Sequence, residues 1–358
     1  MSRAGRKNRI RGLDSLRALA VLGVLLYHAF PVVFSGGFFG VVLFFVISGY
    51  LSGYRTLTQM KERSFSLTDY YRKRFLRIYP ALIVVLLAGT AVLSRIDLYR
   101  LADSRQETLS VLLGYNNFWQ LKMNASYFND LADSSPFTHL WYIAVLIQFD
   151  LVWPWLMLIH SGIRRTSGRY AALLLFFILT VFSFLAMPWA LLVKGKDLSW
   201  IYYATQTRVF SLLAGAFAGM MRAEQLGIRP LKSSNPYIPR ILFTAFVIAT
   251  VLLYMGASGS SRIVYLGGMQ LYTIAACIVI EMIAMNRRTF RRFVDGRLSR
   301  WLSSLSYELY LWQYPVLLFS RLLFPEQSAL IVVSTLVLIF VLSIWLRAFT
   351  ASLMPQRR

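Results

Sequence analysis

The chain has 358 residues, of which 57% are hydrophobic and 15% aromatic. A soluble domain of this length cannot bury that much apolar surface, so the composition excludes a soluble globular protein and indicates an integral membrane protein. Lys and Arg number 38 against 15 Asp and Glu, which gives a formal net charge of +23. This excess indicates either a nucleic-acid partner or anchors on the cytoplasmic side of membrane spans, and the positions of the charges decide between the two.

Apolar stretches of about 20 residues, the length that a helix needs to cross a ~30 Å hydrocarbon core, recur along the chain. We therefore predict an all-α polytopic membrane protein with about ten transmembrane helices. The predicted spans are residues 16–34, 37–54, 78–94, 139–159, 170–188, 201–221, 239–257, 264–285, 301–320 and 328–349.

The basic residues collect in every second connection between these spans. Placing those connections in the cytoplasm puts most of the 38 Lys and Arg inside, as the positive-inside rule requires. Both termini are then cytoplasmic, with a basic N-terminal segment over residues 1–15 and a tail over residues 350–358. The charge thus reports orientation in the cell membrane, and we expect membrane lipid and no nucleic acid among the partners.

The connection over residues 95–138 is longer than the others and faces outward. It contains the apolar stretch VLLGYNNFWQL at residues 111–121, which is too short to span a membrane. We predict an interfacial or re-entrant helix here, with Tyr115 and Trp119 at the level of the lipid headgroups. A loop of this length is more often functional than a simple connection.

The first predicted span carries Arg17 near its cytoplasmic end and His28 in its outer half. Eleven residues correspond to three helical turns plus about 20°, so both side chains lie on one face, roughly 16 Å apart along the axis. Taken singly, Arg17 is equally well a snorkelling anchor, and His28 is more often a buried neutral imidazole. Together they indicate a polar track that enters the membrane from inside.

A second basic pair, Arg74 and Arg77, stands three residues apart on one face of the third predicted span. Two planar guanidinium groups at this spacing can hold phosphate oxygens through paired hydrogen bonds. At an inner membrane edge the same pair would equally well bind lipid headgroups.

Two later spans carry further polar residues. The fourth begins with His139 and Trp141 and carries Asp150 about three turns deeper, for which His28 is the expected partner. The ninth carries Glu308, Tyr310, Trp312 and Gln313 before Pro315.

Several of these stretches together resemble the bacterial membrane acyltransferase-3 family, whose members O-acylate cell-surface glycans. The resemblance rests on GLDSLRALAVLGVLLYHA with its Arg-x10-His, GFFGVVLFFVISGYL with Ser48 and Gly49, the Arg-x-x-Arg of RKRFLRIYP, HLWYIAVLIQF, and SYELYLWQYP. These motifs occur in the family's order from residue 11 to about residue 317. The segment GYNNFWQ with the later SPFTHLWY is most similar to the transmembrane domain of Gram-positive peptidoglycan O-acetyltransferases.

The sequence departs from the family pattern at three points. Leu146 and Ile147 stand where members usually have glutamate, so Asp150 is the nearby carboxylate that could substitute. Gln313 stands where many members have histidine. Peptidoglycan members typically continue into an extracellular SGNH-hydrolase-like domain, and these 358 residues contain none of it. We therefore expect a single acyltransferase-3 domain over residues 1–358, which acts alone, acts with a separate SGNH-type partner, or is part of a longer protein.

The resemblance implies acetyl-CoA or another acyl-CoA as a cytoplasmic donor, an extracytoplasmic glycan as acceptor and no metal. In that scheme Arg74, Arg77 and Arg17 hold the donor, and His28 acts as general base or accepts the acyl group itself. Asp150 or Glu308 orients the histidine. The expected acyl path includes Ser48, Asn117, His139, Trp141, Tyr310 and Trp312.

A transporter or flippase of an acylated or glycan intermediate is the alternative, because many spans with buried charges also suit a carrier. The sequence shows no paired spans broken by Gly or Pro in corresponding halves, which disfavours that alternative. A purely structural scaffold would not explain an Arg-His pair on one face together with Arg-x-x-Arg.

Overall fold

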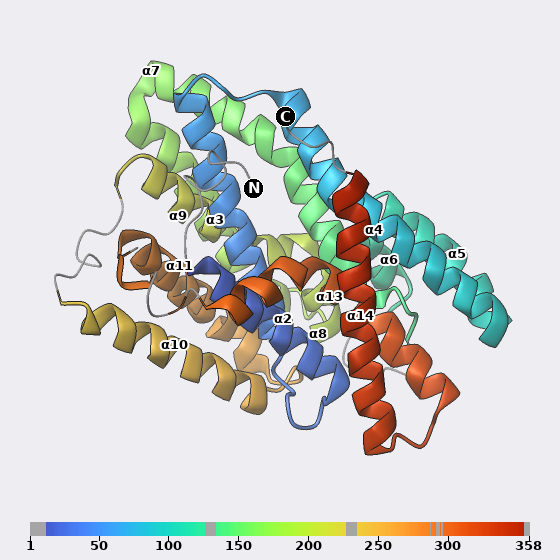
Figure 1. Cartoon of the computed structure of the whole chain (residues 1–358). Helices are drawn as coiled ribbons and strands as arrows, with labels where there is room; N and C mark the ends of the chain where they lie inside the picture. The colour runs from blue at the N-terminus through green and yellow to red at the C-terminus, as the bar shows by residue number, and fades with distance from the viewer. Residues whose placement is uncertain are drawn as a thin grey trace.

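A computed structural model describes residues 12–125, 134–226, 235–286, 288–290, 294 and 296–353, and within these ranges the chain is helical with no strand (Figure 1). The elements are α2 (Leu13–Ala29), α3 (Phe39–Lys61), α4 (Leu67–Ile96), α5 (Leu98–Leu112), α6 (Asn116–Lys122), the 3-10 helix η2 (Thr138–Leu140), α7 (Trp141–Leu192), α8 (Leu198–Tyr203), α9 (Thr205–Ala223), α10 (Tyr237–Gly256), the π-helical turn η4 (Val264–Gly268), α11 (Met269–Met285), α13 (Arg297–Leu323) and α14 (Ala329–Leu353).

The predicted spans all fall on these helices, although several differ from them in their limits. The first span ends at Ala29 instead of residue 34. The fourth and fifth form the long α7, which is interrupted at Gly168 by non-helical backbone (φ 85°, ψ 174°). The sixth is divided at Ala204, whose extended backbone (φ −65°, ψ 130°) separates α8 from α9.

Six helices of the described chain have the length and apolar composition to cross a membrane. They cover Phe39–Lys61, Leu67–Ile96, Thr138–Leu192, Tyr237–Gly256, Val264–Met285 and Ala329–Leu353. This supports a multi-pass membrane protein. The number of about ten spans and the cytoplasmic placement of the termini stay predictions. Residues 1–11 and 354–358, which form most of the predicted N-terminal segment and much of the tail, lie outside the described residues.

The centre of the molecule is the close pair α3 and α9, which approach each other through glycines. A Cβ atom at Gly49 of α3 would lie 2.0 Å from the Leu212 carbonyl oxygen, and one at Gly215 of α9 would lie 2.2 Å from the Val46 carbonyl oxygen. Gly53 and Gly219 repeat the contact four residues later. Helices in lipid have no hydrophobic drive to associate, so such small-residue seams let their backbones pack directly.

The remaining helices flank this pair (Figure 1). α13 packs against α2, α4 and α14 on one side, whereas α11 packs against α3 and α9 and α10 packs against α11 on the other. α4 begins with the Ser66 hydroxyl, which accepts a hydrogen bond from the Asp69 backbone N–H at 3.3 Å. This N-cap fixes where the helix starts and therefore the turn that presents Arg74 and Arg77.

The connection predicted to face outward, residues 95–138 (called the outer connection), contains two helices where a single one was predicted over residues 111–121. Gly114 adopts φ +74°, a left-handed conformation that ends α5 and separates it from α6. The Asp97 carboxylate caps α5 by accepting from the Arg100 backbone N–H at 3.0 Å. Part of this connection, residues 126–133, lies outside the described residues.

Candidate active site

A cavity of about 300 Å³ opens between α2, α3, α4, α7 and α13. Five cationic side chains line it together with one carboxylate, Asp69, so the cavity has an excess of positive charge. The cationic residues are Arg17, Arg55, Lys73, Arg74 and Arg77. Serine and tyrosine hydroxyls line much of the rest, including those of Ser48 and Tyr142. Such a wall suits an anionic ligand with an apolar portion.

Arg74 is fixed in this wall by its neighbours. Its Nε lies 3.3 Å from Asp150 Oδ1, its Nη2 donates to Ser52 Oγ at 2.7 Å, and its guanidinium lies 5.1 Å from the centre of the Tyr70 ring. The Tyr70 hydroxyl donates to the same Asp150 oxygen at 3.0 Å. The prediction that Asp150 pairs with His28 is therefore wrong, because Asp150 neutralises Arg74, which lines the cavity.

Arg17, Arg55 and Arg77 are in a different situation. Within the described ranges, no carboxylate lies within 4 Å of their guanidinium groups, and they are close enough to repel one another. Arg55 and Arg77 are exposed to the cavity. These three cations are therefore available to an anion from outside the chain, and binding one would relieve their mutual repulsion.

Arg55 was not predicted as a site residue. It follows Ser48 by seven residues, which is about two helical turns, and so falls on the same face of α3. That spacing could have indicated it. The sequence offered no comparable signal for Tyr142, because its position on the cavity depends on the packing of α7 against α3.

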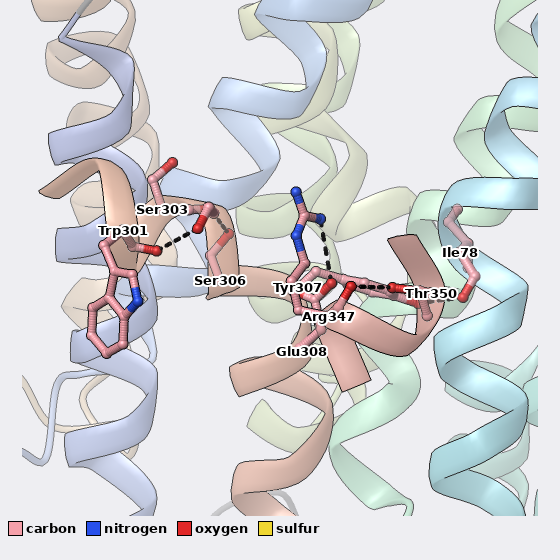
Figure 2. A network of polar contacts seen from close by, with 9 residues as sticks. Ile78, Trp301, Ser303, Ser306, Tyr307, Glu308, Arg347 and Thr350 are labelled. Atoms are coloured by element: carbon pink, nitrogen blue, oxygen red, sulfur yellow. Dashed lines mark hydrogen bonds and ion pairs between the residues drawn. The ribbon is translucent and has the colours of Figure 1, made fainter. Parts of the chain in front are cut away.

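Glu308 also lies near the cationic cavity, on α13. It is buried, and its Oε1 lies 3.5 Å from Nη1 of Arg347 in α14 (Figure 2). The neighbouring Tyr307 donates its hydroxyl to the Ile78 carbonyl of α4 at 2.8 Å. This bond fastens α13 to α4 one residue after Arg77. Glu308 thus has arginine as its partner, in place of the expected His28.

The two histidines lie together further along the helices, around one tyrosine. The His139 ring stacks on Tyr314 with centroids 4.9 Å apart and planes at 15°, and His28 packs edge-on against the same ring, also at 4.9 Å. Gln313 lies within interaction distance of the His28 imidazole. Tyr314 and the short distance between the histidines are features that the sequence analysis missed.

Tyr310 connects the cavity with the histidines. Its ring lines the cavity, packs 5.2 Å from Tyr142 and 5.3 Å from His139, and its hydroxyl donates to the His139 carbonyl. A ligand that extends beyond the cationic wall would therefore have to pass Tyr142 and Tyr310 to reach His28.

The other predicted path residues lie outside this cavity. Asn117 donates to the Tyr203 carbonyl at 3.1 Å and to Thr205 Oγ1 at 2.9 Å, and accepts from Gln148, so it ties α6 to α7 and α9. Trp141 is buried beside Arg208, whose guanidinium lies 5.5 Å from its ring. Trp312 is buried in α13, and its indole N–H has no hydrogen-bond partner among the described residues.

Metal ligation has no support in the part of the chain that the structure describes. No group of three or more His, Cys, Asp or Glu side chains there could hold a metal ion.

Comparison with known proteins identifies the family of the chain. The profile of a family described as "Acyltransferase domain" matches residues 10–348. YrhL of Bacillus subtilis (strain 168) is 32% identical over 314 residues, which cover 87% of this chain and 49% of that protein. No solved structure matches the chain.

Two further relatives are named for an activity. The peptidoglycan O-acetyltransferase OatA of Listeria monocytogenes is 30% identical over 88% of this chain and 51% of its own length. The O-acetyltransferase OatA of Staphylococcus aureus (strain NCTC 8325 / PS 47) is 28% identical over 86% of this chain and 50% of its own length. The chain spans about half the length of these curated relatives, and it belongs to the acyltransferase family.

Proposed function

We propose that the chain is a membrane O-acyltransferase that takes an acetyl or other acyl group from acyl-CoA in the cytoplasm and passes it to a hydroxyl group of an extracytoplasmic glycan. The names of the relatives make peptidoglycan the first candidate acceptor. The observation that carries the proposal is the cavity that holds Arg17, Arg55 and Arg77 without carboxylate partners in the described chain and extends to Tyr310 beside His139.

The donor end of the reaction follows from charge. Coenzyme A carries phosphate groups, and Arg55, Arg77 and Arg17 offer them planar guanidinium groups that can form charge-assisted, paired hydrogen bonds. Arg74 is already held by Asp150, so its contribution is to keep its neighbours in place and to add to the positive potential. A free anion or a lipid phosphate could also bind these arginines. Acyl-CoA differs from both because it carries a thioester arm.

The transfer end follows from the position of the histidines. Arg17 and His28 are roughly 16 Å apart along α2, a length over which a pantetheine arm can carry a thioester past Tyr142 and Tyr310. The hydroxyl oxygen of the acceptor attacks the thioester carbonyl carbon while His28 takes the hydroxyl proton. The carbon–sulfur bond then breaks, and the CoA thiolate leaves and is protonated. The alternative step, with His28 as the first acyl acceptor, uses the same geometry.

Labelled acetyl-CoA tests the proposal on the purified protein in detergent. We expect release of free CoA and transfer of label to chitopentaose, a soluble glycan probe, and we expect His28→Ala to abolish transfer without weakening CoA binding. Binding of CoA without any release would favour a transporter. Absence of CoA binding, with lipid phosphate bound instead, would contradict the donor site.

A further inference from the structure

Glu107 of α5 is a buried carboxyl group that the proposed reaction does not use. It is 2% exposed, in the outer connection. Its Oε1 accepts from Gln120 Nε2 of α6 at 2.6 Å, and its Oε2 accepts from the hydroxyl of Ser135. Glu107 therefore joins three separate segments: α5, α6 and the residues that precede η2. A buried carboxyl that gathers donors from three segments fixes their relative positions.

Ser135 connects Glu107 to the turn that carries His139. Its hydroxyl oxygen also accepts from the Phe137 backbone N–H at 3.3 Å, and its carbonyl accepts from the Thr138 N–H at 3.2 Å. These bonds start the 3-10 helix η2, in which His139 is the central residue. The place of Ser135 thus sets the place of the His139 ring.

The same segment also contacts the tyrosine between the histidines. The Tyr314 hydroxyl hydrogen-bonds with Ser134 and Thr138, on either side of Ser135, and its ring contacts both His139 and His28. A displacement of the segment would therefore move Tyr314 and alter the spacing of the two imidazoles.

A second tie keeps the segment attached to α5 when Glu107 is altered. Arg100, which is paired with Asp97 at 2.9 Å, donates to the Ser134 carbonyl at 3.0 Å. Loss of the Glu107 hold is therefore expected to loosen the geometry of η2 without detaching the outer connection.

We propose that Glu107 is a positioning residue for acyl transfer: its carboxylate holds Ser135, and through it the turn that stacks His139 on Tyr314 beside His28. This inference rests on the proposed function. Glu107 contacts neither histidine, so its effect is exerted through Ser135 and Tyr314.

The hold depends on the ionisation state of Glu107. An ionised carboxylate only accepts hydrogen bonds and so satisfies both Gln120 and Ser135, whereas the protonated form must donate one and loses an acceptor. Burial raises the pKa of Glu107 to about 7. Titratable and charged groups on the elements around it include Tyr203 of α8, Tyr314 of α13, His139 of η2, Lys122 of α6 with its ammonium over Trp119, and Arg95 at the end of α4. On α5 itself they are the Asp97–Arg100 pair, Asp103 and Arg105.

The test compares Glu107→Gln and Ser135→Ala with the wild type and with Asp103→Asn, an exposed position one turn earlier on the same helix. Each purified protein is assayed for CoA affinity and for CoA release from acetyl-CoA with chitopentaose, between about pH 5 and pH 9. The two outcomes to separate are a loss of catalytic rate alone and a general loss of function.

We expect Glu107→Gln and Ser135→Ala to lower kcat about 10- to 100-fold, because a small misplacement of reacting groups has effects of that size. CoA affinity should stay within about twofold of the wild type. The wild-type rate should fall as the pH drops through about 7, and Glu107→Gln should lose that dependence.

Three results would overturn the inference. Wild-type kcat and pH dependence in Glu107→Gln would show that the hold has no effect on transfer. Parallel loss of CoA affinity and kcat would indicate general structural damage. A wild-type protein that neither binds CoA nor releases it from acetyl-CoA would overturn the proposed function, and this inference with it.

Discussion

Replacing Arg77 with alanine tests the donor site most simply. Arg77 faces the cavity and has no carboxylate within 4 Å in the described chain, so alanine removes a ligand contact without leaving a buried partner charge. Hydrogen bonds to charged groups contribute about 1.5–3 kcal/mol each. Since about 1.4 kcal/mol corresponds to a factor of ten, we expect the Kd for CoA to rise about 10- to 100-fold.

The same substitution should not lower the stability of the protein. Arg77 repels Arg74 and Arg17, so its removal relieves unfavourable electrostatics, and we expect an unchanged or higher Tm in detergent. Isothermal titration with CoA gives the affinity, and thermal unfolding gives the Tm.

Two matched variants complete the experiment. Arg72→Ala removes an exposed arginine of the same helix that pairs with Asp69 at 3.2 Å, and it should bind CoA as the wild type does. Arg77→Lys keeps the charge but loses the planar fork, so its affinity should lie between those of wild type and Arg77→Ala. Equal CoA affinity in Arg77→Ala and wild type would refute the reasoning, as would an equal loss in Arg72→Ala.

Three further predictions concern stability. Arg74→Ala leaves Asp150 buried without its cation and should destabilise the protein by about 3 kcal/mol, measured by thermal unfolding, whereas an unchanged Tm would show that the pair is not needed. Gly49→Ala should lower stability by about 3 kcal/mol, because its Cβ atom would meet backbone atoms between α3 and α9. The control Gly162→Ala should leave stability unchanged, because a Cβ atom there meets nothing within 4 Å. Equal effects of the two variants on thermal unfolding would contradict the close packing of α3 and α9. Burial raises the pKa of Glu107 to about 7. The contribution of this carboxyl group to stability is therefore present below the unfolded pKa and is lost as the pH rises through about 7. Glu107→Gln should gain Tm relative to the wild type as the pH rises, and a difference in Tm that does not change with pH would contradict this.

Hydropathy was sufficient to locate the long apolar helices, because a span of about 20 apolar residues is a signal contained in one stretch of sequence. The spacing of Arg17 and His28, and of Arg74 and Arg77, likewise follows from the geometry of a single helix. The same local reasoning missed the breaks at Gly114 and Ala204, since each depends on the backbone conformation of one residue.

Contacts between helices were harder to predict. Asp150 and His28 have suitable chemistry for a pair, yet the packing of α4 against α7 places Asp150 in contact with Arg74 and Tyr70. The stacking of His139 on Tyr314 depends on η2 and α13, which are far apart in sequence. The glycine spacing at Gly49 and Gly53 was available as a signal for close helix packing and could have predicted the central pair.

The central claim is that the cationic cavity binds the acyl-CoA donor, and the most direct measurement is the position of CoA in a cryo-electron microscopy structure of the purified protein. The account predicts phosphate oxygens within hydrogen-bonding distance of Arg17, Arg55 or Arg77 and the thiol directed past Tyr310. CoA bound outside this cavity, with these arginines contacting only lipid, would contradict it.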